Sequence, residues 1–178
     1  GFVLVASYIF YGWWDWRFLF LIALSSLVDF VVGLKLSRTT HTHARKRLLS
    51  ISLITNLGLL FIFKYYGFFA DSLASAFYSI GVQLSLPTLK IILPVGISFY
   101  TFQTLSYTID VYREQLKPTD DAISFFAYVS FFPQLVAGPI ERASFLLPQF
   151  FKERRFDQRK ATEGCRQMLW GLFKKVVV

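Results

Sequence analysis

Long stretches without a single charged residue are the feature of this sequence that most constrains its fold. Two of them, Ile91–Ile109 and Ala122–Ile140, each contain 19 residues. A helix needs about 20 predominantly apolar residues to cross the hydrocarbon core of a bilayer. Charged residues make up only 17% of the chain, whereas soluble domains average about 25%. The sequence therefore predicts an all-α, polytopic transmembrane protein that contacts the lipid bilayer.

Further apolar runs occur on both sides of these two. Phe2–Trp14, Phe18–Leu34 and Leu48–Phe63 precede them, and a sixth run begins near Gly164. The chain starts at Gly1 rather than Met and stops at Val178, inside an apolar stretch. We expect residues 1–178 to be the N-terminal part of a single multi-helix membrane domain, truncated at both ends.

The net charge of +8 is concentrated in short loops between the apolar runs. Positive loops of this kind are typical of the cytoplasmic side of a membrane protein, so we expect no nucleic-acid partner. The loop Lys35–Arg47 contains five basic residues and no acid, and Glu141–Lys160 contains six basic residues. Both segments are predicted to be cytoplasmic. A single cysteine, Cys165, excludes an internal disulfide.

Two cytoplasmic loops cannot be separated by three complete crossings, so one of the three runs between them must fail to cross. The run Ala122–Ile140 is the first candidate, because Pro133, Gly138 and Pro139 fall within it and proline breaks the helical hydrogen-bond ladder. The run Ile91–Ile109, with Pro94 and Gly96 near its start, is the alternative. The sequence therefore predicts a kinked or re-entrant central segment.

Aromatic residues gather where apolar runs meet polar sequence. Tyrosine and tryptophan rings prefer the depth of the lipid headgroups, which predicts an interfacial belt. Its expected members are Tyr11, Trp13, Trp14, Trp16, Tyr65 and Tyr66.

Few residues of the chain are candidates for chemistry. His41 and His43 stand in a basic loop with no nearby acid or cysteine to complete a metal site, and are interpreted as solvated residues. Asp29 lies inside an apolar run, where a carboxylate needs a partner or a function. We favour structural pairing, near the cytoplasmic interface, over substrate handling.

The run Ile91–Ile109 is unusually rich in polar side chains for a helix that faces lipid. They either bind neighbouring helices or line a polar cavity, and the sequence does not separate these alternatives. They are Ser98, Tyr100, Thr101, Gln103, Thr104, Ser106, Tyr107 and Thr108.

Asp110 and Arg113 follow that run at a spacing that places them on one helical face, which predicts an ion pair. The same expectation applies to Glu141 and Arg142. Cys165 is interpreted as a small buried residue rather than a lipidation site.

These features alone fit an enzyme, a transporter or a channel, but two longer segments are more specific. Two segments resemble the membrane-bound O-acyltransferase family. They are LPVGISFYTFQTLSYTIDVYR (Leu93–Arg113) and FFPQLVAGPIERASFLLPQF (Phe131–Phe150). The resemblance is to its bacterial branch, which acetylates alginate and related polysaccharides. SYIFYGWWDWRFL (Ser7–Leu19) and NLGLLFIFKYYGFF (Asn56–Phe69) are similar to the same branch.

The resemblance implies a multi-pass enzyme of the bacterial inner membrane. Such enzymes pass an acyl group, commonly acetyl, from a cytoplasmic thioester such as acetyl-coenzyme A to hydroxyls of an extracytoplasmic polymer such as alginate. It also implies extracytoplasmic acyltransferase partner subunits and a funnel-like, thinned centre. We expect no bound cofactor and no metal.

The resemblance also implies a catalytic histidine downstream of Val178, since the family's histidine follows the segments that these motifs cover. No catalytic residue of this chain is therefore predicted, and the chain alone is expected to be inactive. The motif positions carried over are interpreted as architecture around a tunnel. They are Pro94, Gly96, Ser98, Tyr100, Gln103, Asp110, Arg113, Pro133, Gln134, Gly138, Pro139, Glu141 and Arg142.

Two alternative functions remain at this stage. Within the family, the enzyme would transfer D-alanyl or another acyl group to a cell-wall polymer. Outside it, broken helices at the membrane midplane are typical of transporters. A transporter would be expected to show a second, related half, and the sequence contains no visible internal repeat.

The interpretation of the basic loop leads to a test. In the whole protein that carries this chain, His41→Ala and His43→Ala should each leave the acetyl content of the exported polymer near the parental level, because neither imidazole lies in the expected active site. A loss of about tenfold or more, equivalent to about 1.4 kcal/mol of barrier, at normal protein abundance would contradict this interpretation.

Overall fold

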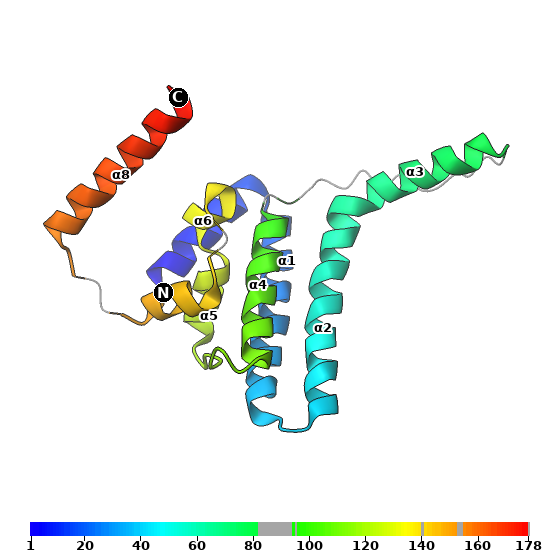
Figure 1. Cartoon of the computed structure of the whole chain (residues 1–178), viewed down its shortest axis with the longest axis horizontal. Helices are drawn as coiled ribbons and strands as arrows, with labels where there is room; N and C mark the ends of the chain where they lie inside the picture. The colour runs from blue at the N-terminus through cyan, green and yellow to red at the C-terminus, as the bar shows by residue number, and fades with distance from the viewer. Residues whose placement is uncertain (82–93, 95, 140, 153–154, 178) are drawn as a thin grey trace.

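The computed structural model describes residues 1–81, 94, 96–139, 141–152 and 155–177, and within these ranges the secondary structure is entirely helical, which confirms the predicted all-α class. Figure 1 shows a bundle of helices from which one helix extends at each side. In chain order the elements are α1 (Phe2–Arg38), α2 (Thr42–Leu60), the π-helical turn η1 (Phe61–Tyr65), α3 (Tyr66–Ser79), α4 (Ile97–Tyr112), α5 (Ala122–Val129), α6 (Phe132–Ala137), α7 (Ala143–Leu146), the 3₁₀ turn η2 (Leu147–Phe150) and α8 (Gln158–Val176).

Helix α1 consists of two helical halves joined at Asp15. The backbone of Asp15 is extended, with φ −160° and ψ 112°, and its carboxylate accepts a hydrogen bond of 3.0 Å from the backbone N–H of Arg17. This is the geometry of an N-cap, so Asp15 ends the first half and begins the second. The division coincides with the boundary between the two apolar runs expected from the sequence.

The aromatic residues near this kink separate into two groups. Trp13, Trp14 and Trp16 are exposed, as an interfacial belt requires. Tyr11, in contrast, is only 5% exposed and belongs to the hydrophobic core, so its assignment to the belt was wrong. Tyr11 faces inward, and Trp13 and Trp14, within one helical turn of it, face outward. The closeness of these residues in the sequence does not reveal this difference.

Helices α2 and α3 are joined without a loop by the π-helical turn η1. A π turn inserts one extra residue per turn and often bends a helix, and Figure 1 shows α3 leaving the bundle at this point. The run predicted to end at Phe63 therefore continues as helix, with Lys64 and Tyr65 inside the bend.

The central break expected from the sequence lies in the run Ala122–Ile140, as favoured. This run forms two short helices, α5 and α6, of 8 and 6 residues. At 1.5 Å per residue they are about 12 and 9 Å long, against a hydrocarbon core of about 30 Å. The interruption falls at Ser130–Phe131, before Pro133, rather than at Gly138–Pro139, which lies after α6.

The run Ile91–Ile109, the alternative candidate for the broken segment, shows no break in its helical part. Residues 91–93 and 95 lie outside the described ranges, and from Ile97 the run is an uninterrupted helix of 16 residues, α4. Pro94 and Gly96 precede its first turn and therefore do not kink it.

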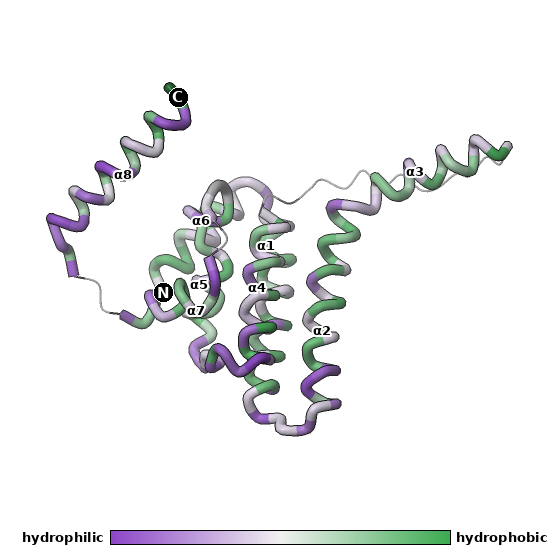
Figure 2. Tube along the Cα trace, viewed as in Figure 1, coloured by the Kyte–Doolittle hydropathy of each residue, from purple (hydrophilic) through white to green (hydrophobic). Residues whose placement is uncertain are grey.

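Two helical stretches within the described residues are long and apolar enough to cross a membrane. They are Phe2–Arg38 and the continuous stretch Thr42–Ser79, formed by α2, η1 and α3. Figure 2 shows hydrophobic residues along both, with hydrophilic residues where α1 meets α2. Helix α8, where a sixth run was expected, begins at Gln158 and is not among these stretches.

The core of the bundle lies between α1, α2, α4 and α5. Helix α4 contacts α1, α2, α5 and α7, and α1 also contacts α5 and α6. The most deeply buried rings are Tyr107, Phe125 and Tyr128. The ring centroids of Tyr107 and Phe125 are 4.7 Å apart, and Tyr107 packs so tightly on Gly33 that a Cβ there would lie 2.8 Å from its ring.

One end of the bundle is held together by Arg45, at the start of α2. Its guanidinium donates hydrogen bonds to the carbonyl oxygens of Leu36 at 3.0 Å, Thr39 at 3.3 Å and Tyr112 at 2.6 Å. It also lies 3.2 Å from a carboxylate oxygen of Glu114. These contacts bind carbonyl groups at the ends of α1 and α4, where the last carbonyls of a helix lack the usual partner four residues further on.

The end of α4 is closed by a Schellman motif. The N–H of Glu114 donates to the carbonyl of Val111 at 3.1 Å, and the N–H of Gln115 donates to that of Asp110 at 2.9 Å. Glu114 adopts φ 61°, a left-handed conformation in which glycine is usual. Its ion pair with Arg45 explains why a glutamate at this position is useful.

These contacts place the basic loop Lys35–Arg47 and the connection after α4 at the same end of the bundle. Helix α2 therefore leads away from that end, and helix α4 returns to it (Figure 1). Helix α5 starts from the same end, and after α6 the chain turns back so that α7 contacts α4 and η2 contacts α5. This path agrees with a run Ala122–Ile140 that enters the bundle without crossing.

The role of Arg45 can be separated from its charge. Arg45→Gln should lower the free energy of unfolding by about 1–3 kcal/mol, because it removes charge-assisted hydrogen bonds at a largely buried position. Lys46→Gln and Arg47→Gln remove the same charge from exposed neighbours and serve as matched controls. Thermal unfolding in detergent micelles measures the difference, and equal effects of all three variants would contradict the assignment.

Candidate functional site

Three helices each contribute two polar residues, spaced four apart, to one buried cluster in the apolar bundle. We call this set the Asp29 cluster. All six side chains are 0% exposed. The pairs are Ser25 and Asp29 on α1, Ser52 and Asn56 on α2, and Thr104 and Thr108 on α4.

Asp29 is the acceptor at the centre of this cluster. One carboxylate oxygen accepts hydrogen bonds from the hydroxyls of Ser52 and of Thr108, the latter at 3.1 Å. The other accepts from the side-chain amide of Asn56 at 2.7 Å. One side chain of α1 thereby binds both α2 and α4.

Asn56 completes the network with its remaining amide atoms. Its carbonyl oxygen accepts hydrogen bonds from Ser25 at 2.6 Å and from Thr104 at 3.2 Å, and its amide also donates to the backbone carbonyl of Ser52 at 3.0 Å. Donors and acceptors are matched throughout, which is required where no water is available to satisfy them.

The cluster resolves two alternatives left open by the sequence. Asp29 has structural partners, as favoured, although it is fully buried rather than close to the interface. The hydroxyls of Thr104 and Thr108 bind across helices rather than lining a cavity. Because its groups already bind one another, the cluster is suited to holding α1, α2 and α4 in register.

The first motif segment places Gly96 at a crowded point before α4. Gly96 has φ 75°, and a Cβ at this position would lie 2.6 Å from the Tyr11 hydroxyl and 2.7 Å from the Leu135 side chain. Only glycine combines this left-handed backbone with so close an approach. Pro94 is buried two residues earlier, and its carbonyl accepts from the N–H of Ile97 at 3.3 Å.

Other polar residues of this segment differ in how they are satisfied. Ser98 accepts a hydrogen bond of 3.1 Å from the Lys64 ammonium in the π turn. Tyr100 and Thr101 are each 1% exposed, and their hydroxyls make no hydrogen bond to the residues that the structure describes. The start of α4 is thus both crowded and rich in hydroxyl groups.

Gln103 connects α4 to α5 through a reciprocal pair of hydrogen bonds. Its side-chain amide donates to the backbone carbonyl of Tyr128 at 2.9 Å, and the Tyr128 hydroxyl donates to the backbone carbonyl of Gln103 at 3.2 Å. This pair fixes the broken element against the continuous helix.

The predicted ion pair between Asp110 and Arg113 is not formed. Asp110 is 9% exposed and faces the bundle, whereas Arg113 is the C-cap residue of α4 and is exposed. A spacing of three residues favours contact only within a continuing helix, and α4 ends here. Arg45 and Glu114 form the ion pair at this end instead.

The second motif segment folds closely on itself around α6. The Gln134 amide donates to the carbonyl of Pro139 at 2.6 Å, while its side-chain oxygen is buried without a hydrogen-bond partner among the described residues. A Cβ on Gly138 would lie 2.6 Å from the Gln134 Cα. Pro133 occupies the first turn of α6, where its missing N–H is not needed.

Glu141 and Arg142 were also expected to form an ion pair, and they do not. Arg142 is exposed and is the N-cap residue of α7, where its backbone carbonyl accepts from Phe145 and Leu146. Ile140, between the two parts of this motif, lies outside the described residues.

The remaining candidates for chemistry lie at the surface. His41 and His43 are exposed, as expected for solvated residues. Cys165 is exposed on α8, so its assignment as a buried residue was wrong. Within the described part of the chain, no group of three His, Cys, Asp or Glu side chains is placed to hold a metal ion.

The expected catalytic histidine has no counterpart among the described residues. It was predicted downstream of Val178, and Val178 itself lies outside the described ranges, which end at residue 177. The expectation of a catalytic residue beyond Val178 therefore stays a prediction. The two histidines that the structure does describe, His41 and His43, lie in the exposed connection between α1 and α2 and at the start of α2.

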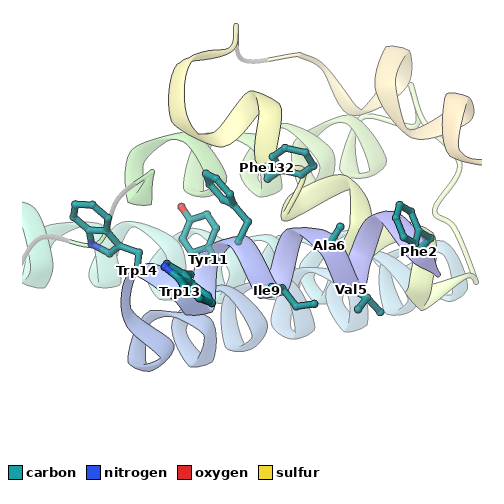
Figure 3. Close-up of a pocket in the computed structure, with 9 residues that line it drawn as sticks. Phe2, Val5, Ala6, Ile9, Tyr11, Trp13, Trp14 and Phe132 are labelled. Carbon is teal, nitrogen blue, oxygen red and sulfur yellow. The ribbon is translucent and has the colours of Figure 1, made fainter.

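An apolar groove of about 1010 Å³ lies beside the first half of α1. Figure 3 shows that Phe132 of α6 contributes to its wall together with side chains of α1. The groove contains no charged side chain, and the Tyr11 hydroxyl is the one ionisable group among its lining side chains. Its lining residues are Phe2, Val5, Ala6, Ile9, Phe10, Tyr11, Trp13, Trp14 and Phe132.

The structure therefore brings the two motif segments together but does not gather all their residues at one point. Gly96 of the first segment meets Leu135 of the second, and Gln103 of the first segment binds Tyr128, which precedes the second. Asp110 and Arg113 lie at the opposite end of α4. No arrangement among these described residues provides a base next to a nucleophile.

Sequence analysis missed Ser25, Ser52 and Asn56 as partners of Asp29. A usable signal was present, because each of three apolar runs contains two polar residues four positions apart. This spacing places both on one face of a helix. Three such faces in one membrane domain favour a common polar contact.

The Asp29 cluster predicts a specific loss of stability. Asp29→Leu should lower the free energy of unfolding by about 1–3 kcal/mol, because it leaves the Asn56 amide and two hydroxyls without their acceptor. Asp71→Leu, the same change at an exposed position of α3, should have little effect. Thermal unfolding in detergent measures both, and an Asp29→Leu variant as stable as the parent would contradict the role of the carboxylate.

Comparison with known proteins shows homology along nearly the whole chain. It is 41% identical over 177 residues to the probable alginate O-acetylase AlgI of Pseudomonas aeruginosa, covering 99% of this chain and 34% of that protein. The protein of the same name from Azotobacter vinelandii is 39% identical, with 99% and 35% covered. The peptidoglycan O-acetyltransferase of Helicobacter pylori is 32% identical, with 99% and 37% covered.

No family model and no solved structure matches the chain. The chain spans about a third of the length of the curated relatives that it matches. The homology includes both motif segments, on which the resemblance to membrane-bound O-acyltransferases was based. Together with the two long apolar helices, it identifies a membrane protein. By this homology, the chain is similar along nearly its whole length to a part of proteins named as bacterial polysaccharide O-acetylases.

Proposed function

We propose that the chain is part of a membrane-bound O-acetyltransferase that passes an acetyl group across the bacterial inner membrane to hydroxyls of an extracytoplasmic polysaccharide. The observation that carries this proposal is identity of 32–41% along 99% of the chain to proteins named as O-acetylases of alginate or peptidoglycan. Those names also favour acetyl over D-alanyl transfer, and an enzyme over a transporter.

The geometry supports this function through the broken element of the bundle. In the membrane, a non-helical backbone is tolerated only where it is enclosed by protein or lines a wet cavity. Helices α5 and α7, on either side of the broken region, contact α4, which is itself polar on its buried face. Next to the interruption, the N–H of Phe132 donates to the Ser7 hydroxyl of α1 at 3.4 Å. These segments are suited to the wall of a thinned passage between donor and acceptor.

The proposed chemistry is attack of a polymer hydroxyl on the carbonyl carbon of a thioester. A general base takes the proton of the hydroxyl, the new ester bond forms, and the carbon–sulfur bond breaks to release a thiol. We propose an intramembrane histidine as the base, in the part of the whole protein that follows Val178. The motif residues of this chain would shape and position the passage.

The acyl donor is proposed to be acetyl-coenzyme A or another cytoplasmic thioester. Exposed basic residues that follow α6, among them Arg142 and Arg155, would attract its phosphates. Arg154, which the sequence also suggested for this role, lies outside the described residues. The loop Lys35–Arg47 would face the same compartment, since positive loops are retained in the cytoplasm.

We also propose a multi-pass topology in the inner membrane, which the same charge distribution supports. Transfer to an exported polymer needs an acceptor surface on the opposite face, which we propose is completed by extracytoplasmic acyltransferase partner subunits. The names of the relatives suggest two acceptors, alginate and peptidoglycan. We propose an alginate-like polymer, because the alginate O-acetylases share more identity with this chain.

Complementation tests the proposal. The whole protein that carries this chain is expressed in an alginate-producing bacterium lacking its own alginate O-acetylase, and ester-linked acetate is measured on alginate and on muramic acid. Acetate on alginate supports the proposal. Acetate on muramic acid alone would overturn the acceptor assignment, and acetate on neither polymer, with the protein present in the membrane, would overturn the proposed function.

The close approach at Gly138 yields a test of the passage. Gly138→Leu should lower polymer acetylation about tenfold while protein abundance stays within about twofold, since the new side chain would displace the Gln134–Pro139 contact. Gly58→Leu is the matched control, because no atom lies within 4 Å of a Cβ there. A parallel fall of abundance and acetylation would indicate that Gly138 serves folding alone.

A further inference from the structure

Helix α8 differs from the other long helices because its apolar residues, Trp170 excepted, lie along a single face. At 100° per residue, this face repeats every three or four positions and is about 140° wide. Figure 2 shows hydrophilic and hydrophobic residues alternating along the helix. The apolar face consists of Ala161, Cys165, Met168, Leu169, Leu172, Phe173 and Val176.

Basic residues occupy the remainder of the helix surface. Five basic residues and one acid give α8 a net charge of +4. Glu163 is paired with Arg159 at 3.3 Å, and the ammonium of Lys174 lies 5.3 Å from the centroid of the Trp170 ring. The basic residues are Arg159, Lys160, Arg166, Lys174 and Lys175.

The described residues of the bundle do not cover this apolar face. Met168, Leu169 and Leu172 are 69%, 68% and 58% exposed, and Figure 1 shows α8 apart from the bundle. The helix is nevertheless well defined at its start, where the Asp157 carboxylate accepts from the N–H groups of Arg159 and Lys160 at 3.0 and 3.2 Å. An exposed apolar face of this size needs an apolar environment.

A transmembrane position does not suit α8. It is not among the described helices that are long and apolar enough to cross a membrane, and a crossing by residues 158–176 would carry Arg166 into the hydrocarbon, where charge is strongly disfavoured. A helix with an apolar face, a basic face and aromatic rings is instead typical of the interface, where it lies parallel to the bilayer plane.

We propose that α8 lies along the surface of an anionic bilayer, with its apolar face among the acyl chains and its basic residues on phospholipid phosphates. Charge complementarity identifies the occupant, since a net charge of +4 matches an anionic lipid surface and not a neutral one. The proposal rests on the membrane character of the chain and is independent of the acetyltransferase function.

The single cysteine of the chain allows a direct test, because Cys165 lies on the proposed lipid face. The whole protein that carries this chain, with any cysteine outside the chain replaced by serine, is reconstituted into vesicles containing phosphatidylglycerol and spin-labelled at Cys165. Collisions of the label with lipid-soluble oxygen and with a water-soluble nickel chelate are measured. The matched control, Cys165→Ser with Gln167→Cys, places the label on the opposite face.

The expected result is a label at 165 that collides preferentially with oxygen and a label at 167 that collides preferentially with the nickel chelate. Three results would overturn the proposal. Nickel accessibility at both positions indicates a solvated helix, oxygen preference at both indicates a crossing, and protection of position 165 from both reagents indicates docking on protein.

The charge requirement is tested separately. Arg166→Gln with Lys174→Gln should shift the ratio of immersed to free label at Cys165 by about tenfold or more toward the free form in phosphatidylglycerol vesicles. Arg166→Lys with Lys174→Arg keeps both charges and should leave the ratio unchanged. In vesicles of neutral phosphatidylcholine, the neutralised and the charge-conserving variants should give the same ratio. A neutralised variant that stays immersed would overturn the role of anionic lipid.

Discussion

The buried carboxylate of Asp29 is the interaction on which the rest of the bundle depends. It binds Ser52 and Asn56 on α2 and Thr108 on α4, so a single side chain fixes the mutual register of three helices. Apolar packing alone specifies such a register weakly in a membrane, because lipid tails are as apolar as leucine. A matched set of donors and acceptors is specific, since any shift along a helix leaves a polar group unsatisfied.

Once α1, α2 and α4 are fixed, the broken element has a defined surface to pack against. Gln103 and Tyr128 exchange hydrogen bonds between α4 and α5, and Gly96 allows α6 to approach the start of α4. At the other end, Arg45 connects the loop between α1 and α2 to the end of α4. Helix α4 is therefore the element through which the motif segments and the polar cluster are connected.

Much of this organisation follows from the sequence. The uncharged runs predict helices, the prolines predict a broken segment in residues 122–140, and Asp29 signals a buried partner. Asp110, Arg113, Tyr11 and Cys165 show where such inference fails. Spacing places Asp110 and Arg113 on one helical face, but the helix ends between them and one side chain faces the core. Clustering places Tyr11 with the interfacial tryptophans, but Tyr11 lies on the face of α1 that packs into the core, whereas Trp13 and Trp14 lie on exposed faces.

The sequence by itself determined the all-α class, the membrane character and, through its motif segments, the resemblance to membrane-bound O-acyltransferases. These properties depend on composition and on the local pattern of polar and apolar residues, both of which can be read directly from the sequence. Only the tertiary structure decided which polar residues meet in the Asp29 cluster, why glycine stands at position 96, and that α8 keeps an uncovered apolar face. The physical reason is that hydrogen bonding and close packing depend on the separation of atoms from distant parts of the chain, and the helical period predicts which face a residue occupies but not what that face will contact.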